Sequence, residues 1–412
     1  MSMDSLLSPV YLVTSTPRWY LWSIFILGII TYYLCEVVKK PLLVTADGDF
    51  KKFLINNVPL VSEKFWPTIW CFESRAQTLL AGMLRSLVLP KIKYKREVLQ
   101  LQDGGQVALD WLEPAGAGES GGQTAVLIVL PGLTGTSHAE YVKGLALAAF
   151  RANIRAVVFN NRGIGGVELK TPRTYCASNT DDLHDVIQHI RAKYPGAPIG
   201  GVGVSMGGLI LGNYMASRGK EGCAQLAAAM LISVPWDVFK GTESIERPGI
   251  NLMLNNHLAS CLTSVVHDLR EMLRTTGPLD EVMKARTIRE FDSRFTSKQF
   301  GYKDVDDYYN HATLHNKLHN IHVPTLCISA GDDPFQPFNA IPIENAQKVE
   351  NLAILVTSHG GHIGFMEGVW PFNKDQYMFR VCEQFFKAIL PSGAYKNFGA
   401  TVIDKPNGDH HA

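Results

Sequence analysis

The sequence predicts an α/β protein in which a mostly parallel sheet is flanked by helices, preceded by one N-terminal transmembrane helix. Short apolar runs alternate with helical patterns, and these runs lack the polar alternation of a half-exposed strand, as a parallel sheet covered by helices requires. Residues 19–38 are almost entirely apolar over the length of a membrane-spanning helix. With 412 residues, 46% of them hydrophobic, the chain can bury a large core.

The charge balance and the cysteines argue against several classes of function. The chain has 39 Lys and Arg against 38 Asp and Glu, so its formal net charge of +1 gives no long-range field, and we expect no nucleic-acid partner. The seven cysteines are scattered, odd in number and never in a close metal-ligand pair, which argues against a disulfide framework and a zinc site. We expect neither a metal nor an organic cofactor.

Residues 19–38 are expected to form an uncleaved membrane anchor. Only Glu36 is charged, and aromatic residues lie near both ends of the run, as they do at membrane interfaces. A cleavable signal peptide has a shorter apolar run, and a buried core helix, the alternative, normally has a polar face. We expect a single-pass protein of an intracellular membrane such as the endoplasmic reticulum. Lysines after the run favour a cytosolic C-terminal side, but the side of the main domain stays open.

Composition divides the chain into five segments. The connecting segment after the membrane helix is rich in aromatic residues, so it is expected to pack on the main domain or on the membrane surface instead of forming a solvated linker. The expected segments are an N-terminal tail at 1–18, the membrane helix at 19–38, the connecting segment at 39–93, the main domain at 94–395 and a flexible tail at 396–412.

The main domain is predicted to begin with an antiparallel hairpin. Apolar and polar residues alternate over 94–101 and 106–111 on either side of Asp103-Gly104-Gly105, which is a hairpin signal. Residues 235–321 lie between two later strands and have helical spacing, so they predict a helical cap over the sheet edge where ligands bind. Fully apolar strands are expected to start near residues 125, 155, 198, 227, 324 and 352.

The segment Gly203-Val204-Ser205-Met206-Gly207 fits the pattern G-x-S-x-G and lies where a predicted strand meets a predicted helix. The glycines are needed because a Cβ two residues from the serine on either side would collide with neighbouring backbone in such a tight turn. The pentapeptide alone occurs by chance in many chains. Its position between strand and helix identifies Ser205 as the candidate nucleophile.

A serine nucleophile requires a base and a group that orients the base, and both candidates follow later strands. Asp333 follows the strand near 324, and His362 follows the strand near 352, which gives the chain order Ser, Asp, His of the α/β-hydrolase fold. Asp332 is the alternative acid, and we prefer Asp333 because an acid four residues before a proline is common at this loop. We prefer His362 over His359 because neighbouring glycines let its loop reach the serine.

Two backbone amides are expected to stabilise the oxyanion of the tetrahedral intermediate. One is the amide of Met206, directly after the nucleophile, and the other is that of Leu133, in the glycine-containing loop after the strand near 125. In residues 159–166, Arg162 lies among glycines. We favour a role for its side chain in bracing loops around the site over a role in binding a phosphate. Their G-I-G-G run lacks the spacing of a dinucleotide-binding loop.

With these residues placed, the chain resembles the membrane-anchored α/β-hydrolase-domain proteins numbered one and three, part of a wider family of esterases. The resemblance implies Ser205, Asp333 and His362 as a catalytic triad. Some relatives with this fold transfer acyl groups and carry H-x4-D at the histidine, but Glu367 stands at that spacing here, so acyl transfer is not supported. The segments that carry the resemblance are FWPTIWCFESRAQTLL, LPGLTGTS, FNNRGIGG, TPRTYCASNTDDL, GVSMGG, ARTIREFDSRFTS, DDPFQP and GGHIGF.

The resemblance also implies a lipid substrate. It implies a membrane-bound serine hydrolase that cleaves acyl esters of phospholipids through an acyl-enzyme, with phosphatidylcholines carrying a short or medium acyl chain as substrates. The alternatives are an esterase or thioesterase for smaller acyl esters and a catalytically silent scaffold on the same fold. Acyl-chain length, head group, the sn-1 or sn-2 position and oligomeric state stay open.

Overall fold

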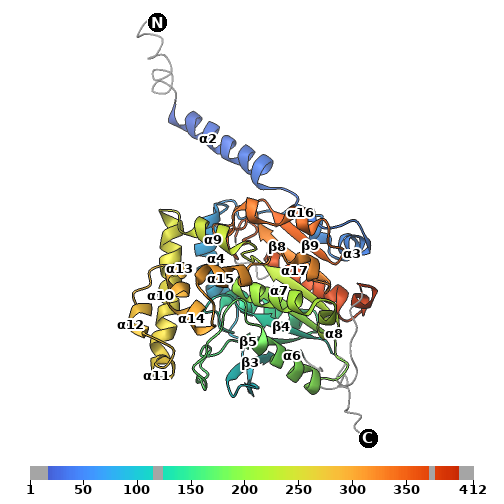
Figure 1. The fold of residues 1–412 in the computed structure, drawn as a ribbon. Coiled ribbons are helices and arrows are strands. Elements are labelled where there is room, and N and C mark those ends of the chain that lie inside the picture. Colours follow the sequence, from blue (N-terminus) through green and yellow to red (C-terminus); the bar gives the residue numbers. More distant parts are fainter. Residues whose placement is uncertain (1–16, 115–123, 371–375, 399–412) are drawn as a thin grey trace.

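A nine-stranded sheet forms the centre of the computed structural model, which describes residues 17–114, 124–370 and 376–398 (Figure 1). The strand order is β1-β9-β8-β7-β6-β4-β5-β3-β2. The strands from β9 to β5 run parallel, whereas β1, β3 and β2 pair antiparallel at the two edges. The sheet is therefore mostly parallel. The tails expected at 1–18 and 396–412 lie mostly outside the described residues.

The parallel strands coincide with the fully apolar runs of the sequence. Every residue of β4 to β9 is buried, because helices cover both faces of the sheet. The hairpin expected around Asp103 is formed by β2 and β3. The strands are β1 (Leu42–Val44), β2 (Lys95–Gln100), β3 (Gln106–Leu112), β4 (Val126–Leu130), β5 (Arg155–Asn160), β6 (Ile199–Val204), β7 (Ala228–Ile232), β8 (Thr325–Ala330) and β9 (Leu352–Thr357).

Glycines of the central strand β6 show which helix covers each face. A Cβ on Gly200 would lie 3.0 Å from Phe386 of α17, whereas one on Gly201 would lie 3.1 Å from Leu211 of α7. Successive strand residues point to opposite faces, so α17 and α7 cover opposite sides of the sheet. Helix α5 packs on α17, and α6 packs on α7. The helices around the sheet, with the short helix α8 that follows α7, are α5 (Glu140–Arg151), α6 (Asp181–Lys193), α7 (Met206–Arg218), α8 (Gly222–Gln225) and α17 (Tyr377–Ile389).

The region between β7 and β8 is helical and lies together at one side of the body (Figure 1). It has a hydrophobic cluster of its own, which includes Leu262, Val266 and Phe295. Its elements are α9 (Val238–Ile245), α10 (Ile250–Asp268), α11 (Arg270–Leu273), α12 (Leu279–Val282), α13 (Ile288–Phe291), the π-helical turn η4 (Asp292–Thr296), α14 (Ser297–Gln299), α15 (Val305–Ala312) and η5 (Leu318–Asn320).

The N-terminal part begins with a projecting helix, α2 (Arg18–Tyr32), continued by the π-helical turn η1 (Tyr33–Val37) (Figure 1). Together these 20 residues, which contain an 18-residue stretch with a mean hydropathy of 1.6, are long and apolar enough to cross a membrane, a test that N-terminal signal sequences also pass. The connecting segment then joins the body: β1 pairs with β9, and α4 packs on α5. The sequence did not predict β1, because three residues show no periodicity.

The remaining elements are short, apart from α4. Arg162 has a bracing role, as the sequence favoured: it pairs with Asp103 in the turn between β2 and β3 at 2.7 Å and with Asp182 in the first turn of α6 at 2.6 Å. The elements not yet given are α3 (Asp49–Asn57), η2 (Pro59–Val61), α4 (Ser74–Val88), η3 (Gly219–Glu221), η6 (Phe338–Ala340), α16 (Ile343–Ala346) and η7 (Ala394–Phe398).

Candidate active site

Ser205 lies in the sharp turn between β6 and α7, with a φ of 52° and a ψ of −116°. This left-handed region is costly for a residue with a side chain, and it is typical of strained functional positions. The flanking positions must be glycine because neighbouring backbone atoms leave no room for a Cβ. A Cβ on Gly203 would lie 2.4 Å from the carbonyl oxygen of Gly207, and one on Gly207 would lie 2.2 Å from that of Leu130.

The structure brings Ser205, His362 and Asp333 together, although they are far apart in the sequence. The Oγ atom of Ser205 lies 2.9 Å from Nε2 of His362. Nδ1 of the same ring lies 2.9 Å from Oδ2 of Asp333 and 3.2 Å from Oδ1. A carboxylate accepts hydrogen bonds only, so Nδ1 carries the proton and Nε2 is free to accept from the serine hydroxyl.

The two neighbouring aspartates have different partners. Asp333 is 4% exposed, and its Oδ1 also accepts the Phe335 backbone N–H at 2.8 Å. Asp332 instead accepts the Gly361 N–H at 3.0 Å, and burial raises its pKa to about 7. The ring of Phe335 stacks on His362 with centroids 4.2 Å apart, which fixes the imidazole plane. Of the two carboxyl groups, the structure therefore places that of Asp333 against His362.

His359 is not part of this network. Its Nδ1 lies 3.2 Å from the hydroxyl of Ser358, and burial lowers the pKa of its imidazole. Of the two histidines, the structure thus places His362 against Ser205.

The loop expected to bind the oxyanion is held by two tyrosines. The Gly132 N–H donates to the Tyr141 hydroxyl at 2.9 Å, and the Thr134 N–H donates to the Tyr175 hydroxyl at 3.2 Å. Burial raises the pKa of both phenols, that of Tyr175 to about 12, so both stay protonated near neutral pH. Among the described residues, the intervening Leu133 N–H has no hydrogen-bond acceptor, so it is available for a ligand.

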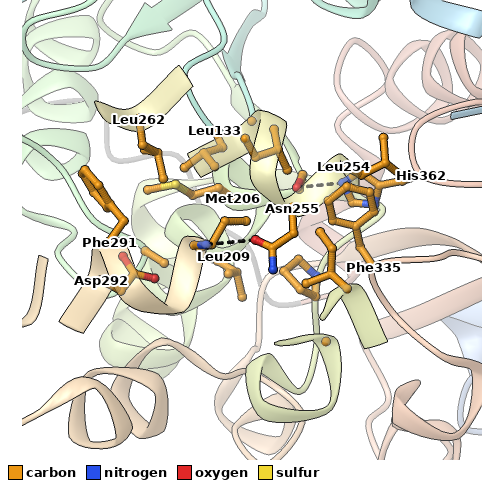
Figure 2. Close-up of a pocket in the computed structure, with 18 of the residues that line it drawn as sticks. Leu133, Met206, Leu209, Leu254, Asn255, Leu262, Phe291, Asp292, Phe335 and His362 are labelled. Carbon is orange, nitrogen blue, oxygen red and sulfur yellow. Dashed lines mark hydrogen bonds between the residues drawn. The ribbon is translucent and has the colours of Figure 1, made fainter. Parts of the chain in front are cut away.

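The Met206 N–H likewise has no acceptor within the described part of the chain. It begins α7, so the positive end of that helix dipole adds to its attraction for an anion. Leu133 and Met206 lie next to each other at the edge of the same cavity (Figure 2). The two predicted amides therefore come from separate loops that meet beside Ser205.

A mostly apolar cavity of about 480 Å³ extends from Ser205 under the helical region. Figure 2 shows His362 and Phe335 at one end of it and Phe291 and Asp292 at the other. A cavity of this size accommodates a drug-sized ligand or part of a lipid. Its apolar lining includes Leu133, Leu209, Val238, Ile245, Leu254, Leu258, Leu262, Val266, Phe291 and Phe295.

Asp292 is a buried carboxyl group in this apolar lining, and burial raises its pKa to about 7. The Tyr309 hydroxyl donates to its Oδ2 at 3.2 Å. In the unfolded chain the pKa lies near 3.9, so between about pH 4 and pH 7 the folded state holds a proton that the unfolded state has lost. Stability contributed by this group is therefore lost as the pH rises through this window.

We expect Asp292→Asn to stabilise the protein at high pH, because the amide can still accept from Tyr309 but never ionises. The difference in melting temperature between the variant and wild type, measured in the same detergent, should be larger at pH 8.5 than at pH 5 by on the order of 5 °C. Thermal denaturation at the two pH values measures this difference. An equal offset at both values would show that folding does not raise the pKa of Asp292, because the carboxyl group would then be ionised to the same extent in the folded and unfolded states.

No pattern in the sequence indicated that α4 holds the histidine loop. Arg85 of α4 is 2% exposed and donates to the carbonyl oxygen of Ile363 at 2.8 Å and to that of Gly364. The hydroxyl of Thr78 accepts the backbone N–H of His362 at 2.9 Å. These contacts hold His362 from a segment that precedes the strand near 125, so Arg85 and Thr78 are positioning residues. No local pattern could have linked positions nearly 300 residues apart.

We expect Arg85→Met to lower kcat by about 10²-fold with little change in KM, because a displaced imidazole no longer aligns with the serine. Thr78→Val should have a smaller effect, about fivefold, since it removes one neutral hydrogen bond. Steady-state kinetics on a soluble ester measures both. Arg151→Met, which breaks the 2.7 Å ion pair with Glu383 outside the cavity, is the control. Equal losses in kcat for Arg85→Met and Arg151→Met would contradict the positioning role.

The sheet order, the strained strand-to-helix turn at Ser205 and the loops that carry Asp333 and His362 define an α/β-hydrolase. The chain belongs to the family described as "alpha/beta hydrolase fold", which matches residues 125–369. It is 44% identical over 364 residues to the proteins named "Phospholipase ABHD3" from Bos taurus and Homo sapiens, covering 88% of this chain and 87% and 88% of theirs.

A more distant relative is "Putative esterase YheT" from Escherichia coli, which is 31% identical over 316 residues, 74% of this chain and 88% of that protein. The predicted family resemblance, the fold class and the enzyme class of hydrolase are thus confirmed. The likeness to the first two proteins extends well beyond the family's matched region into the N-terminal segment that holds α4, since 364 aligned residues exceed the span 125–369.

Proposed function

We propose that this protein is a membrane-bound serine hydrolase that cleaves acyl esters of phospholipids. The observation that carries the proposal is the continuous hydrogen-bonded line Ser205–His362–Asp333, which opens on an apolar cavity. The relatives named as phospholipases, at 44% identity over most of the chain, support the substrate class. Part of an acyl chain is the ligand that such an apolar lining suits.

The reaction proceeds through an acyl-enzyme. His362 takes the proton from Ser205 Oγ at Nε2 while Oγ bonds to the ester carbonyl carbon, and the Leu133 and Met206 amides donate to the resulting oxyanion. Asp333 accepts from Nδ1 and stabilises the imidazolium. The C–O bond to the alcohol then breaks, and the proton on Nε2 passes to the leaving alkoxide, a lysophospholipid. A water molecule, deprotonated by the same nitrogen, releases the fatty acid and regenerates the serine.

Cavity size supports phosphatidylcholines with a short or medium acyl chain over those with two long chains. The cavity of about 480 Å³ is in the range of drug-sized ligands, so it holds one acyl chain of limited length more easily than a complete long-chain lipid.

We also propose that residues 19–38 remain attached as a membrane anchor. The Tyr33 hydroxyl donates to the Pro67 carbonyl at 2.6 Å, and the Ser358 hydroxyl donates to the Val37 carbonyl at 3.0 Å. Tyr33 and Val37 are buried against the body. Cleavage at the C-terminal end of this helix would remove part of the folded body, which supports an uncleaved anchor. We propose an intracellular membrane such as the endoplasmic reticulum as its location.

The test is hydrolysis of defined lipids by the full-length protein in liposomes. Phosphatidylcholines with one short, medium or long acyl chain are supplied, and released fatty acid and lysophospholipid are measured by mass spectrometry, with Ser205→Ala as the blank. We expect release that is largest for short and medium chains. Labelling by a fluorophosphonate without release from any phospholipid would support the small-ester alternative, and a folded protein that does not label would support the silent scaffold.

A further inference from the structure

Large apolar side chains are exposed on two helices beside the cavity. On α4, Leu79 is 53% exposed, Met83 56% and Leu87 72%, and their spacing of four residues puts them on one face of the helix. On α10, Ile250 is 47% exposed and Met253 69%. Single exposed apolar residues are ordinary, but a row on one helix face indicates a surface that contacts something apolar. These five residues are called the apolar rim below.

The apolar rim lies beside the catalytic cavity, which Leu79 helps to line. Leu79 of α4 and His257 of α10 are both exposed to solvent and line the cavity, so the cavity opens to the outside between these helices. The two helices are joined near their N-terminal ends, where Nε of Arg75 donates to Oδ1 of Asn251 at 2.9 Å. A ligand that enters between α4 and α10 therefore passes the rim.

The first turns of α4 lie close to the end of the anchor helix. The Phe72 ring packs near those of Tyr32 and Tyr33, at centroid distances of 6.1 and 6.2 Å, and α4 begins two residues later. At about 1.5 Å per residue, Leu87 lies only about 20 Å along α4 from its start. The face of α4 is thus within reach of a bilayer that α2 crosses, and α2 runs above this part of the body (Figure 1).

Exposed tryptophans mark the same region. The Trp70 ring packs near that of Trp370, tilted by 49° with centroids 6.1 Å apart, and its Nε1 donates to the Val369 carbonyl at 2.8 Å. Both indoles are about half exposed or more. Tryptophan side chains are enriched where proteins meet the membrane–water interface, because the ring is amphipathic. Trp70 lies two residues before Phe72, which packs on the end of the anchor helix, and this position favours lipid over a soluble protein as the occupant of this surface.

We propose that the apolar rim on α4 and α10 inserts into the surface of the bilayer that holds the anchor, so that a lipid enters the cavity directly from the membrane. The entry of lipid rests on the proposed function, whereas contact of the rim with the bilayer does not. The same α4 holds the His362 loop through Arg85 and Thr78. The helix at the membrane surface is thus also the helix that positions the catalytic base.

The first test compares two substrates in the full-length protein reconstituted in phosphatidylcholine liposomes. Met83→Glu and Leu87→Glu place a charge on the rim but not in the cavity, and they should lower hydrolysis of the bilayer lipid by about tenfold. Hydrolysis of a water-soluble butyrate ester should change less than about twofold, because the site itself is intact. Val98→Glu is the matched control, since Val98 is 47% exposed on the edge strand β2. Equal losses for both substrates, or for Val98→Glu, would overturn the proposal.

The second test does not depend on catalysis. A polarity-sensitive fluorophore is attached at Met83→Cys or at Val98→Cys in full-length Ser205→Ala protein whose Cys35 and Cys261 are replaced by serine. We expect a blue-shifted emission that brominated phosphatidylcholine quenches at position 83 but not at position 98. A water-like emission at position 83 would overturn the proposal, and so would a blue shift without quenching, which would indicate a second copy on the rim. Failure of the proposed function alone would abolish lipid hydrolysis in wild type but leave this quenching.

Discussion

Ser205→Ala is expected to lower kcat by about 10⁶-fold on any ester substrate, the largest effect of any single substitution. The hydroxyl is the only atom that forms the acyl-enzyme, and without it His362 has no proton to take. The Leu133 and Met206 amides and the cavity would still bind the ester, so KM should change little. A residual rate above that in water is expected, because the oxyanion site can still stabilise direct attack by water.

Fluorophosphonate labelling and steady-state hydrolysis of a soluble ester measure this effect. The matched control is Ser217→Ala, which makes the same change further along α7, where the hydroxyl donates only to the Tyr214 carbonyl. The control should label and turn over like wild type. Labelling that persists in Ser205→Ala would assign the nucleophile to another residue and would contradict the proposed mechanism.

Most of the sheet was predictable because its strands carry their own signal. β4 to β9 are buried on both faces, so nearly all of their positions are apolar or small, apart from Arg155 and Asn160 at the two ends of β5, and such runs can be recognised without knowledge of their neighbours. β1 carries no such signal. Its three residues form a strand only because β9 offers an edge, with Leu42 opposite Val356. Strands that depend on a distant partner are not specified by local propensity.

The same distinction applies to the site. Ser205 and the loops of Asp333 and His362 were predictable because the order of elements in a parallel sheet fixes which loops meet at one edge. The positioning role of α4 was not predictable. Its contacts join a segment that precedes the main domain in the sequence to the His362 loop near the C-terminal end of that domain. In addition, an arginine in an amphipathic helix is ordinarily a solvated residue.

The choice between adjacent aspartates depends on geometry, and it leads to the second large effect. Asp333→Asn is expected to lower kcat by about 10⁴-fold. An amide nitrogen facing Nδ1 would donate and not accept, so the ring would carry its proton on Nε2, and the serine hydroxyl would lose its base. Oδ1 of Asp333 accepts the Phe335 N–H at 2.8 Å, whereas the shorter contact of His362 Nδ1 is with Oδ2 at 2.9 Å, so an amide oxygen that keeps the Phe335 bond turns its nitrogen toward Nδ1.

Asp332→Asn is the matched control, one residue away with the same change in chemistry. Its oxygen can still accept the Gly361 N–H, and burial already raises the pKa of the wild-type carboxyl to about 7, so much of it is neutral near neutral pH. We expect a loss in kcat of less than about threefold, which corresponds to at most one weakened neutral hydrogen bond. Comparable losses in both variants would contradict the assignment, and a larger loss for Asp332→Asn would make Asp332 the residue that orients His362.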